Sequence, residues 1–247
     1  MKNSGNTILV TGGGSGIGRE MARRWHEAGN TVIVAGRTQA AIEETARGHA
    51  NMHAMQLDVA SADDVARFIE ELLERFPSLN VLVNNAGIMR FEEVTTARDL
   101  GDASAMIETN LLAPIRLIDA LIEHLRGQTD AAIINVTSGL AFVPMPRAAT
   151  YSATKAALHS YTVSLRTKLE GQVEVIEIAP PAVQTELTPG QSQRDGYMSL
   201  DAFIEETMAP FENGKPPAEV LTQTVLFLRN AEAEGRFHEA LEVTSQF

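Results

Sequence analysis

The chain has 247 residues, a length typical of one α/β domain and large enough to bury a stable core without disulfides or metals. Its 20 basic and 32 acidic side chains give a net charge of −12, which makes nucleic acid or an anionic membrane an unfavourable partner, although backbone N–H groups can still hold a small phosphate ligand. Cysteine is absent, so disulfides, thiolate metal sites and cysteine nucleophiles are excluded.

The N-terminus is polar and leads directly into a short predicted strand. Residues 1–6 contain no apolar stretch of the kind found in signal peptides. No segment of the chain approaches the about 18 consecutive apolar residues of a membrane span. We therefore expect a cytoplasmic protein.

Short apolar runs alternate with helical patterns along most of the chain. The predicted strands are residues 7–10, 31–34, 52–57, 81–83, 131–136 and 173–178, and the predicted helices include residues 18–28, 40–47, 63–76 and 110–125. Continuous apolar strands indicate burial on both faces of a parallel sheet. The predicted fold class is α/β, a doubly wound parallel sheet with helices on both faces (Rossmann-type), in a single domain over residues 1–247.

One later region has a different composition. Residues 180–217 hold six prolines and only a weak helical pattern, over residues 200–208. Long excursions of this kind often cover a site. We interpret residues 186–215 as a substrate-side lid or loop, not as a second domain.

A glycine-rich turn, Thr-Gly-Gly-Gly-Ser-Gly-Ile-Gly at residues 11–18, joins the first predicted strand to the first predicted helix. Glycines allow a tight turn and let a pyrophosphate approach the backbone, where the helix N-terminus offers free N–H groups. The spacing Gly-x3-Gly-x-Gly differs from the G-x-G-x-x-G of other dinucleotide folds, so a plain flexible connection is the alternative. The residues expected to bind a dinucleotide here are Gly12, Ser15, Gly16, Ile17 and Gly18.

The end of the second predicted strand bears on which dinucleotide binds. An NAD site usually has an acidic residue there, which holds the ribose hydroxyls. This chain instead reads Val-Ala-Gly-Arg-Thr, and Arg37 can pair with a 2′-phosphate. We therefore expect NADP, with NAD possible; the alternative is a solvated loop arginine.

Tyr151 and Lys155 are four residues apart, which places them on one face of a helix, and Ser138 follows the fifth predicted strand. An ammonium about 4 Å from a phenol, at an effective dielectric of about 20, contributes about 4 kcal/mol, or roughly three pKa units. Lys155 is therefore expected to lower the pKa of Tyr151 toward the range of a general acid/base, with Ser138 orienting the substrate oxygen. An exposed helix pair is the alternative.

Asn110 precedes Pro114 by four residues in a helical pattern. Because proline has no N–H, the carbonyl of Asn110 loses its usual helical donor. We predict that the helix bends here and that a water at this carbonyl links Asn110 to Lys155. The alternative is a proline kink without a role.

Taken together and in order, these motifs resemble the short-chain dehydrogenase/reductase superfamily over residues 7–185. The resemblance implies that Asp58 and Val59 contact the adenine, and that Asn85, Ala86 and Gly87 border the ribose and stabilise the central strand. It further implies that Tyr151 and Lys155 meet the nicotinamide end. The catalytic set that it implies is Asn110, Ser138, Tyr151 and Lys155.

Two departures from the family pattern stand out. A proline, Pro181, replaces the usual glycine after the sixth predicted strand, which leaves the loop path open, while Val183 and Thr185 can still meet the nicotinamide. Residues 235–247 do not resemble the usual glycine-rich seventh strand, so the sheet edge is expected to be shorter or altered. These departures resemble a group of bacterial oxidoreductases associated with D-alanyl esterification of cell-wall polymers.

The predicted function is an NADP(H)-dependent oxidoreductase that transfers hydride between the nicotinamide and a carbonyl or secondary alcohol. Residues 186–212 are expected to line an apolar substrate pocket together with Met89, Leu140, Phe142, Val143 and Met145, although these could also be ordinary core residues. The main alternative is a dinucleotide-binding sensor or scaffold with little turnover. A hydrolase is more distant, because Val136 and Leu140 stand where a nucleophile elbow needs glycines.

Two further expectations concern assembly and metals. The resemblance implies a homodimer or homotetramer built on the helices around Asn110 and Tyr151. No metal site is expected. His49 and His53 are four residues apart, but they flank a loop–strand junction and are interpreted as solvated or structural.

Overall fold

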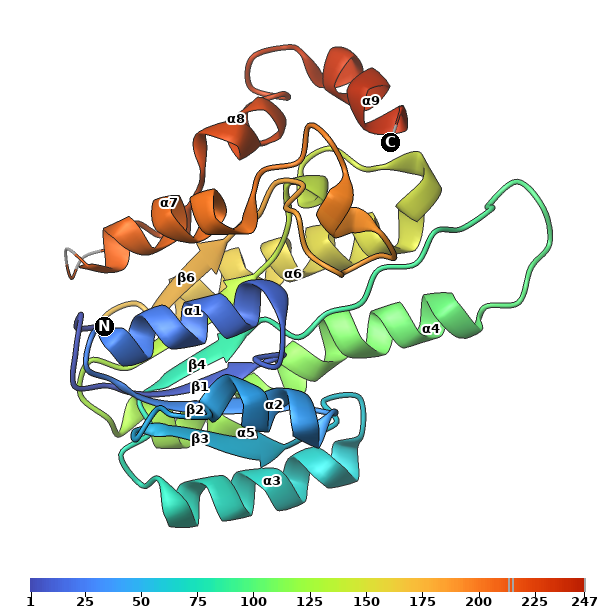
Figure 1. The fold of residues 1–247 in the computed structure, drawn as a ribbon. Helices are drawn as coiled ribbons and strands as arrows, with labels where there is room; N and C mark the ends of the chain where they lie inside the picture. The colour runs from blue at the N-terminus through green and yellow to red at the C-terminus, as the bar shows by residue number, and fades with distance from the viewer. Residues whose placement is uncertain (213, 215, 247) are drawn as a thin grey trace.

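The computed structural model describes residues 1–212, 214 and 216–246. Within these residues, all strands join one parallel sheet in the order β3-β2-β1-β4-β5-β6-β7 (Figure 1). The strands are β1 Thr7–Thr11, β2 Thr31–Gly36, β3 Met52–Gln56, β4 Val81–Asn84, β5 Ala132–Val136, β6 Glu174–Ile178 and β7 Glu219–Val220. The six predicted strands and the doubly wound fold class are therefore confirmed, with strand ends shifted by one or two residues.

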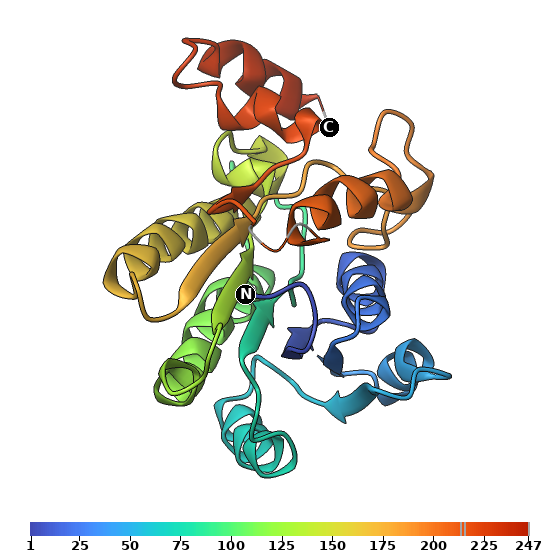
Figure 2. The ribbon, with the colours of Figure 1, turned by 90° about the vertical axis from the view of Figure 1, so that its left-hand side faces the viewer.

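Helices cover both faces of the sheet (Figure 2). One apolar cluster joins α1, α2 and α7 to the strands, and a second joins α3 and α5 to their other face. The helices are α1 Gly16–Glu27, α2 Gln39–Ala46, α3 Ala62–Arg75, α4 Gly101–Ile107, α5 Ala113–Arg126, α6 Ala149–Lys168, α7 Leu200–Glu212, α8 Gln223–Arg229 and α9 Phe237–Ser245. None of the helices in the described residues is long and apolar enough to cross a bilayer.

Helix α3 shows how local sequence sets these elements. The Ser61 hydroxyl accepts a hydrogen bond from the Asp64 N–H at 3.2 Å and so caps the first turn. Val65, Phe68 and Leu72 recur at helical spacing and are buried against the sheet. The strands bury side chains on both faces, as their continuous apolar runs predict; every residue of β1 and β5 is buried.

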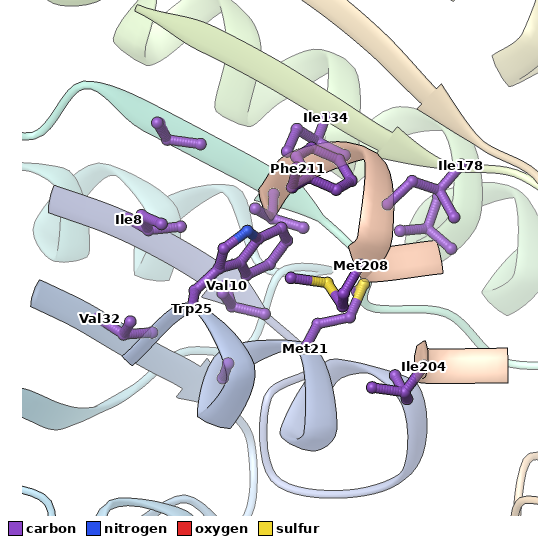
Figure 3. Packing of buried hydrophobic residues seen from close by; sticks show 14 of the residues in the cluster. Ile8, Val10, Met21, Trp25, Val32, Ile134, Ile178, Ile204, Met208 and Phe211 are labelled. Carbon is purple, nitrogen blue, oxygen red and sulfur yellow. The ribbon is translucent and has the colours of Figure 1, made fainter. Parts of the chain in front are cut away.

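The segment interpreted as a lid, residues 186–215, divides into two parts. Its first part is an irregular loop, whereas its second part is α7, which packs on α1. Figure 3 shows Trp25 and Met21 of α1 facing Phe211 and Met208 of α7, with the Trp25 and Phe211 rings edge to face at 5.7 Å. Residues 213 and 215 of this segment lie outside the described residues. The second half of the segment is thus part of the helical layer of the fold.

The C-terminal region departs from a long seventh strand, as expected. β7 has two residues and pairs in parallel with β6, and the chain then forms α8 and α9 beyond this edge of the sheet (Figures 1 and 2). The Thr244 hydroxyl donates to the Pro144 carbonyl at 2.7 Å, and Val143 is fully buried against Ala231 and Ala240. These two helices therefore cover the chain that follows β5.

Candidate active site

A cleft of about 440 Å³ lies at the carboxyl ends of the central strands. It spans the boundary between β1 and β4, where the strand order reverses, which is the usual ligand position in an open α/β sheet. Its volume falls within the range of ligand pockets. The structure places all the residues expected at the dinucleotide around this one cleft: Gly12, Ser15, Gly16, Ile17, Gly18, Arg37, Asp58, Val59, Asn85, Ala86, Gly87, Tyr151, Lys155, Pro181, Val183 and Thr185.

The glycine turn is packed too closely for larger residues. A Cβ on Gly12 would lie 2.8 Å from the Ala86 Cα, and one on Gly18 would lie 2.5 Å from the Gly12 carbonyl oxygen. Gly12 and Gly16 also have φ of 67° and 51°, which glycine adopts without strain. The backbone at the start of α1 is thus bare on its cleft side, which fits the approach of a pyrophosphate.

Thr11 and Asn85 hold this turn against the end of β4. The Thr11 hydroxyl donates to the Val83 carbonyl at 3.1 Å and accepts from the backbone N–H groups of Asn85 and Ala86. The Asn85 amide donates to the Thr11 carbonyl at 2.9 Å. Asn85 was expected to border the ribose and to stabilise the central strand. Its side-chain amide also forms a hydrogen bond directly with the glycine turn.

Arg37 lies exposed at the far end of the cleft, close in sequence to the end of β2. It forms no ion pair with any residue that the structure describes, so its guanidinium has no carboxylate to neutralise it. Asp58 and Val59 line the same end. The Asp58 backbone N–H donates to the Asp64 carboxylate at 2.7 Å, which fixes the turn after β3.

Tyr151, Ser138 and Lys155 meet at the other end of the cleft, and each is at least nine-tenths buried. Ser138 follows β5 and its side chain forms a hydrogen bond with the Tyr151 phenol. The Lys155 ammonium donates to the Val136 carbonyl at 2.8 Å and lies 5.7 Å from the centre of the Tyr151 ring. The two side chains therefore share one face of α6, as their spacing predicts.

The expected lowering of the Tyr151 pKa by Lys155 does not appear in the protein chain by itself. Burial raises the pKa of Tyr151 to about 12, against a smaller lowering by the hydrogen bond with Ser138. The Lys155 ammonium is directed at the Val136 carbonyl, and burial lowers its own pKa to about 8. At neutral pH the phenol is therefore protonated, which is the form that can donate a proton.

We expect the buried Lys155 to lower the free energy of unfolding at neutral pH. Its pKa of about 8 lies below the ordinary 10.5, so between these values the unfolded chain binds more protons than the folded one, and stability rises with pH. This shift corresponds to about 3 kcal/mol, from which a lost hydrogen bond to Val136 subtracts about 1 kcal/mol. We expect Lys155→Met to raise the free energy of unfolding at pH 7 by about 1–2 kcal/mol.

Denaturant unfolding between pH 6 and pH 10.5 checks this expectation. The gain should be complete below pH 8 and should shrink as the pH rises toward 10.5. Lys168→Met, at an exposed position near the end of α6, is the matched control and should show no such pH dependence. A Lys155→Met gain that is constant over the whole range would contradict a charge effect.

Asn110 is completely buried in a π-helical turn, Glu108–Leu112, between α4 and α5. Its side-chain oxygen accepts from the Ile88 N–H and its amide donates to the Ile88 carbonyl, both at 2.9 Å. A Cβ on Gly87 would lie 3.3 Å from the Asn110 oxygen and 3.7 Å from the Lys155 nitrogen. Asn110 thus fixes the backbone beside Lys155, and the water link between them stays a prediction.

An apolar cluster rich in methionine packs around Tyr151. Tyr151 packs with Met89, Met106 and Met145, and with the partly buried Leu140 and Leu187. The expectation that these side chains line the cleft is met only in part: Leu187 lines it with Glu186 and Gln191, whereas Met89, Leu140 and Met145 pack in this cluster without lining the cleft. Phe142 and Val143 lie outside the cluster as well. Val143 packs under α8 and α9, and the Phe142 ring packs edge to face on His159, 5.1 Å away. The reason is that the chain after Ser138 forms a short turn, Gly139–Ala141, and then runs beneath α8 and α9, which cover Val143.

Proline at position 181 does not prevent an ordered path after β6. The Met198 N–H donates to the Ala182 carbonyl at 2.9 Å, and the Gln184 N–H donates to the Met198 carbonyl at 2.8 Å. These bonds pair Val183 in parallel with Met198. The two ends of the loop that carries Thr185 and Leu187 are therefore tied together beside the cleft.

Comparison with known proteins agrees with this geometry. Residues 6–196 match the family model of short chain dehydrogenases. The chain belongs to the short-chain dehydrogenase family. This membership makes it an oxidoreductase of the NAD(P)-dependent dehydrogenase/reductase class.

Relatives cover nearly the whole of this short-chain dehydrogenase. It is 41% identical over 239 residues to the Bacillus subtilis uncharacterized oxidoreductase DltE, covering 94% of this chain and 93% of the relative, which confirms the expected subgroup. It is 34% identical to sulfoacetaldehyde reductase 2 of Chromohalobacter salexigens, covering 81% of each. A Burkholderia cenocepacia short chain dehydrogenase, solved in complex with NADP, is 25% identical with a TM-score of 0.82, covering 98% of this chain and 99% of that one.

A group of polar residues behind the active site of this short-chain dehydrogenase was not predicted from the sequence. Glu177 of β6 is fully buried, and it contacts Thr137 and His159. One signal was available: Glu177 is an acidic residue between two apolar ones in the fully buried part of β6. Among the described residues, no three acidic or histidine side chains are grouped as a metal site would require.

Proposed function

We propose that this short-chain dehydrogenase is an NADP(H)-dependent oxidoreductase for a carbonyl or secondary alcohol, with Tyr151 as its general acid/base. The observation that carries the proposal is the meeting of Tyr151, Ser138 and Lys155 at one end of a cleft whose other walls are the bare glycine turn and Arg37. A bound dinucleotide would supply or accept the hydride at the Tyr151 end.

The protein's own residues would handle the substrate oxygen and its proton. Ser138, already hydrogen-bonded to the phenol, would hold the oxygen beside Tyr151. In the reducing direction, the protonated phenol would donate to the oxygen as negative charge develops there. The Lys155 ammonium would favour the phenolate that remains, and the apolar side chains packed around Tyr151 would limit the access of water to it.

The preference for NADP over NAD is supported by Arg37 and by the NADP complex of the Burkholderia relative. A charge-assisted hydrogen bond contributes about 1.5–3 kcal/mol, so Arg37→Ala should weaken NADPH binding by roughly 10- to 100-fold. NADH binding should change less than about threefold, because NADH has no 2′-phosphate. Calorimetric titration with each dinucleotide measures both effects.

Arg47→Ala provides the matched control for Arg37→Ala. Arg47 is also an exposed arginine next to α2, but it follows the other end of this helix, pairs with Glu44 and does not line the cleft. Equal weakening of NADPH and NADH by Arg37→Ala would argue against 2′-phosphate recognition. Equal weakening by both variants would point to a general loss of positive charge.

Turnover distinguishes the enzyme from a dinucleotide-binding sensor. NADPH oxidation should be observed with members of a broad panel of aldehydes and ketones that includes small anionic aldehydes, since a relative is named as a sulfoacetaldehyde reductase. Binding of NADPH without oxidation on the whole panel would favour the sensor. Cofactor-independent ester cleavage would favour a hydrolase.

A homodimer or homotetramer is the assembly we propose. Ile107 and Leu112 on the α4–α5 segment and Val163 on α6 are each more than 40% exposed. Exposed apolar side chains on neighbouring helices are typical of a contact between subunits. Light scattering on the purified protein measures the mass, and a monomer at micromolar concentration would contradict this assembly.

A further inference from the structure

A second polar cluster lies directly behind the active site. The Glu177 carboxylate has no exposed surface; it accepts a hydrogen bond from the Thr137 hydroxyl at 2.6 Å and contacts His159 Nδ1 at 2.8 Å. Burial costs a carboxylate roughly several kcal/mol of hydration free energy. A buried carboxylate therefore needs partners that compensate this loss. Thr137 and His159 are thus the partners that hold the Glu177 carboxylate within the core.

This cluster is joined to Lys155 through two routes. On α6, Lys155 and His159 are four residues apart and therefore share one helix face with each other. On β5, the Lys155 ammonium donates to the Val136 carbonyl, and the next residue, Thr137, donates to Glu177. Both α6 and β5 therefore link the lysine to the carboxylate through neighbouring residues, His159 on the helix and Thr137 on the strand.

We propose that Glu177 is a positioning residue for Lys155, and that its buried carboxylate is the counter-charge that keeps the lysine protonated next to Tyr151. The proposal rests on the proposed function in one respect: a charged Lys155 matters for catalysis only if Tyr151 is the general acid/base. The proximity of the two groups follows from the pairing of β5 with β6 and from the hydrogen bonds of Lys155 and Thr137.

The surrounding charges agree with this assignment. Burial lowers the pKa of Lys155, and the charge of Glu177 opposes this lowering. The hydrogen bond with Glu177 raises the pKa of His159. The charged or titratable groups that face this cluster come from α6, β6, β7 and α8: Tyr151, Lys155, His159, Arg166, Glu177, Glu219 and Arg229.

Glu219 and Arg229 largely cancel one another. Arg229 donates to the Glu219 carboxylate at 2.7 Å, and the two act on His159 in opposite directions. Glu177 has no such cationic partner fixed by geometry, since His159 is charged only when protonated. Glu177 is therefore a carboxylate near Lys155 whose described hydrogen-bonding partners, Thr137 and His159, include no arginine.

The chain suits a direct measurement, because it contains only four lysines, at positions 2, 155, 168 and 215. Lysine labelled with carbon-13 at Cε gives few NMR signals, and Lys155→Met assigns the buried one. We expect the pKa of Lys155 to fall by at least about 0.5 unit in Glu177→Gln, which removes the charge and keeps the shape. Glu177→Met is a second uncharged variant of similar length, in case the first does not fold.

His159→Asn is the matched control. It alters the other side of the same contact but leaves the Glu177 charge in place, so the pKa of Lys155 should stay within about 0.2 unit of the wild-type value. An unchanged Lys155 pKa in a folded Glu177→Gln or Glu177→Met protein would overturn the proposal. An equal fall in His159→Asn would overturn it as well, since packing would then explain the effect.

The measurement needs neither cofactor nor substrate, so a failed reductase proposal would leave its result intact. Where turnover is found, the alkaline limb of the pH profile of kcat/KM should move to lower pH in Glu177→Gln. The same limb should not move in His159→Asn. Glu177 would have only a structural role if the alkaline limb of the pH profile stayed in place in both variants and the pKa of Lys155 were also unchanged.

Discussion

Tyr151→Phe should reduce kcat of NADPH-linked carbonyl reduction by about 100- to 10,000-fold, the usual contribution of a positioned general acid. The change removes one oxygen from a side chain that is 6% exposed, and it leaves the ring packed on Met89 and Met145. The hydroxyl does make one hydrogen bond, to Ser138, whose oxygen still accepts from the Leu140 N–H. Folding and NADPH affinity should therefore change little, within about threefold for binding.

Single-turnover kinetics with saturating NADPH measure this loss, and calorimetry measures the binding. Tyr161→Phe is the control, because Tyr161 lies on the same helix but packs in the cluster on the opposite side of the strands from the glycine turn. A Tyr151→Phe protein that retains more than about a tenth of the wild-type kcat would exclude the phenol as the proton donor. A loss of equal size in Tyr161→Phe would indicate damage to α6.

Gly18→Ala should abolish dinucleotide binding and destabilise the fold, although alanine is intrinsically favoured in a helix by about 1 kcal/mol. The added Cβ would lie 2.3 Å from the Asn85 side-chain nitrogen and 2.5 Å from the Gly12 carbonyl oxygen. Relieving such overlap costs about 1–3 kcal/mol or more, which exceeds the gain in propensity. The first turn of α1 must move away from the glycine turn, and the Asn85 bond to Thr11 is then strained.

Urea unfolding and titration with NADPH measure the two effects separately. Gly14→Ala is the graded control, since its Cβ would meet the Ala41 side chain at 3.1 Å and no backbone atom at a shorter distance. We expect at least a tenfold loss of NADPH affinity in Gly18→Ala, a factor that corresponds to about 1.4 kcal/mol. A Gly18→Ala protein as stable as the wild type would show that the close approach of α1 to the turn is not needed.

The wide cleft and the apolar wall beside Tyr151 have different structural origins. The cleft arises where parallel strands end at the reversal of strand order, so every strand-end motif opens into it. The wall is assembled from the loop after β4, the turn after β5 and the loop at Leu187, which are far apart in the chain. The surroundings of Tyr151 therefore depend on segments that carry no periodic pattern.

Much of this arrangement could be predicted from local patterns. The continuous apolar run of β1, followed by glycines and a helix, predicts a strand–turn–helix unit, and the four-residue spacing of Tyr151 and Lys155 predicts a shared helix face. The strand-end positions of Asn85 and Ser138 then place them at one edge of a parallel sheet. Each of these inferences needs only backbone periodicity and the rule that parallel strands end together.

Three features could not be predicted in this way. The pKa of Tyr151 depends on its burial by side chains from other segments, and the position of Val143 depends on α9, which packs over it. The pairing of α7 with α1 through Phe211 and Trp25 joins residues that are remote in sequence. None of these contacts leaves a periodic trace in the chain.

The sequence alone determined the βα alternation, the glycine turn and the identity of the residues at the strand ends, because these follow from short-range spacing and from backbone geometry. Only the tertiary structure decided the environment of those residues: the buried, protonated Tyr151, the Lys155 ammonium directed at the Val136 carbonyl, and the Glu177 carboxylate behind it. Burial and charge act through space, so they depend on which distant segments the folded chain brings together.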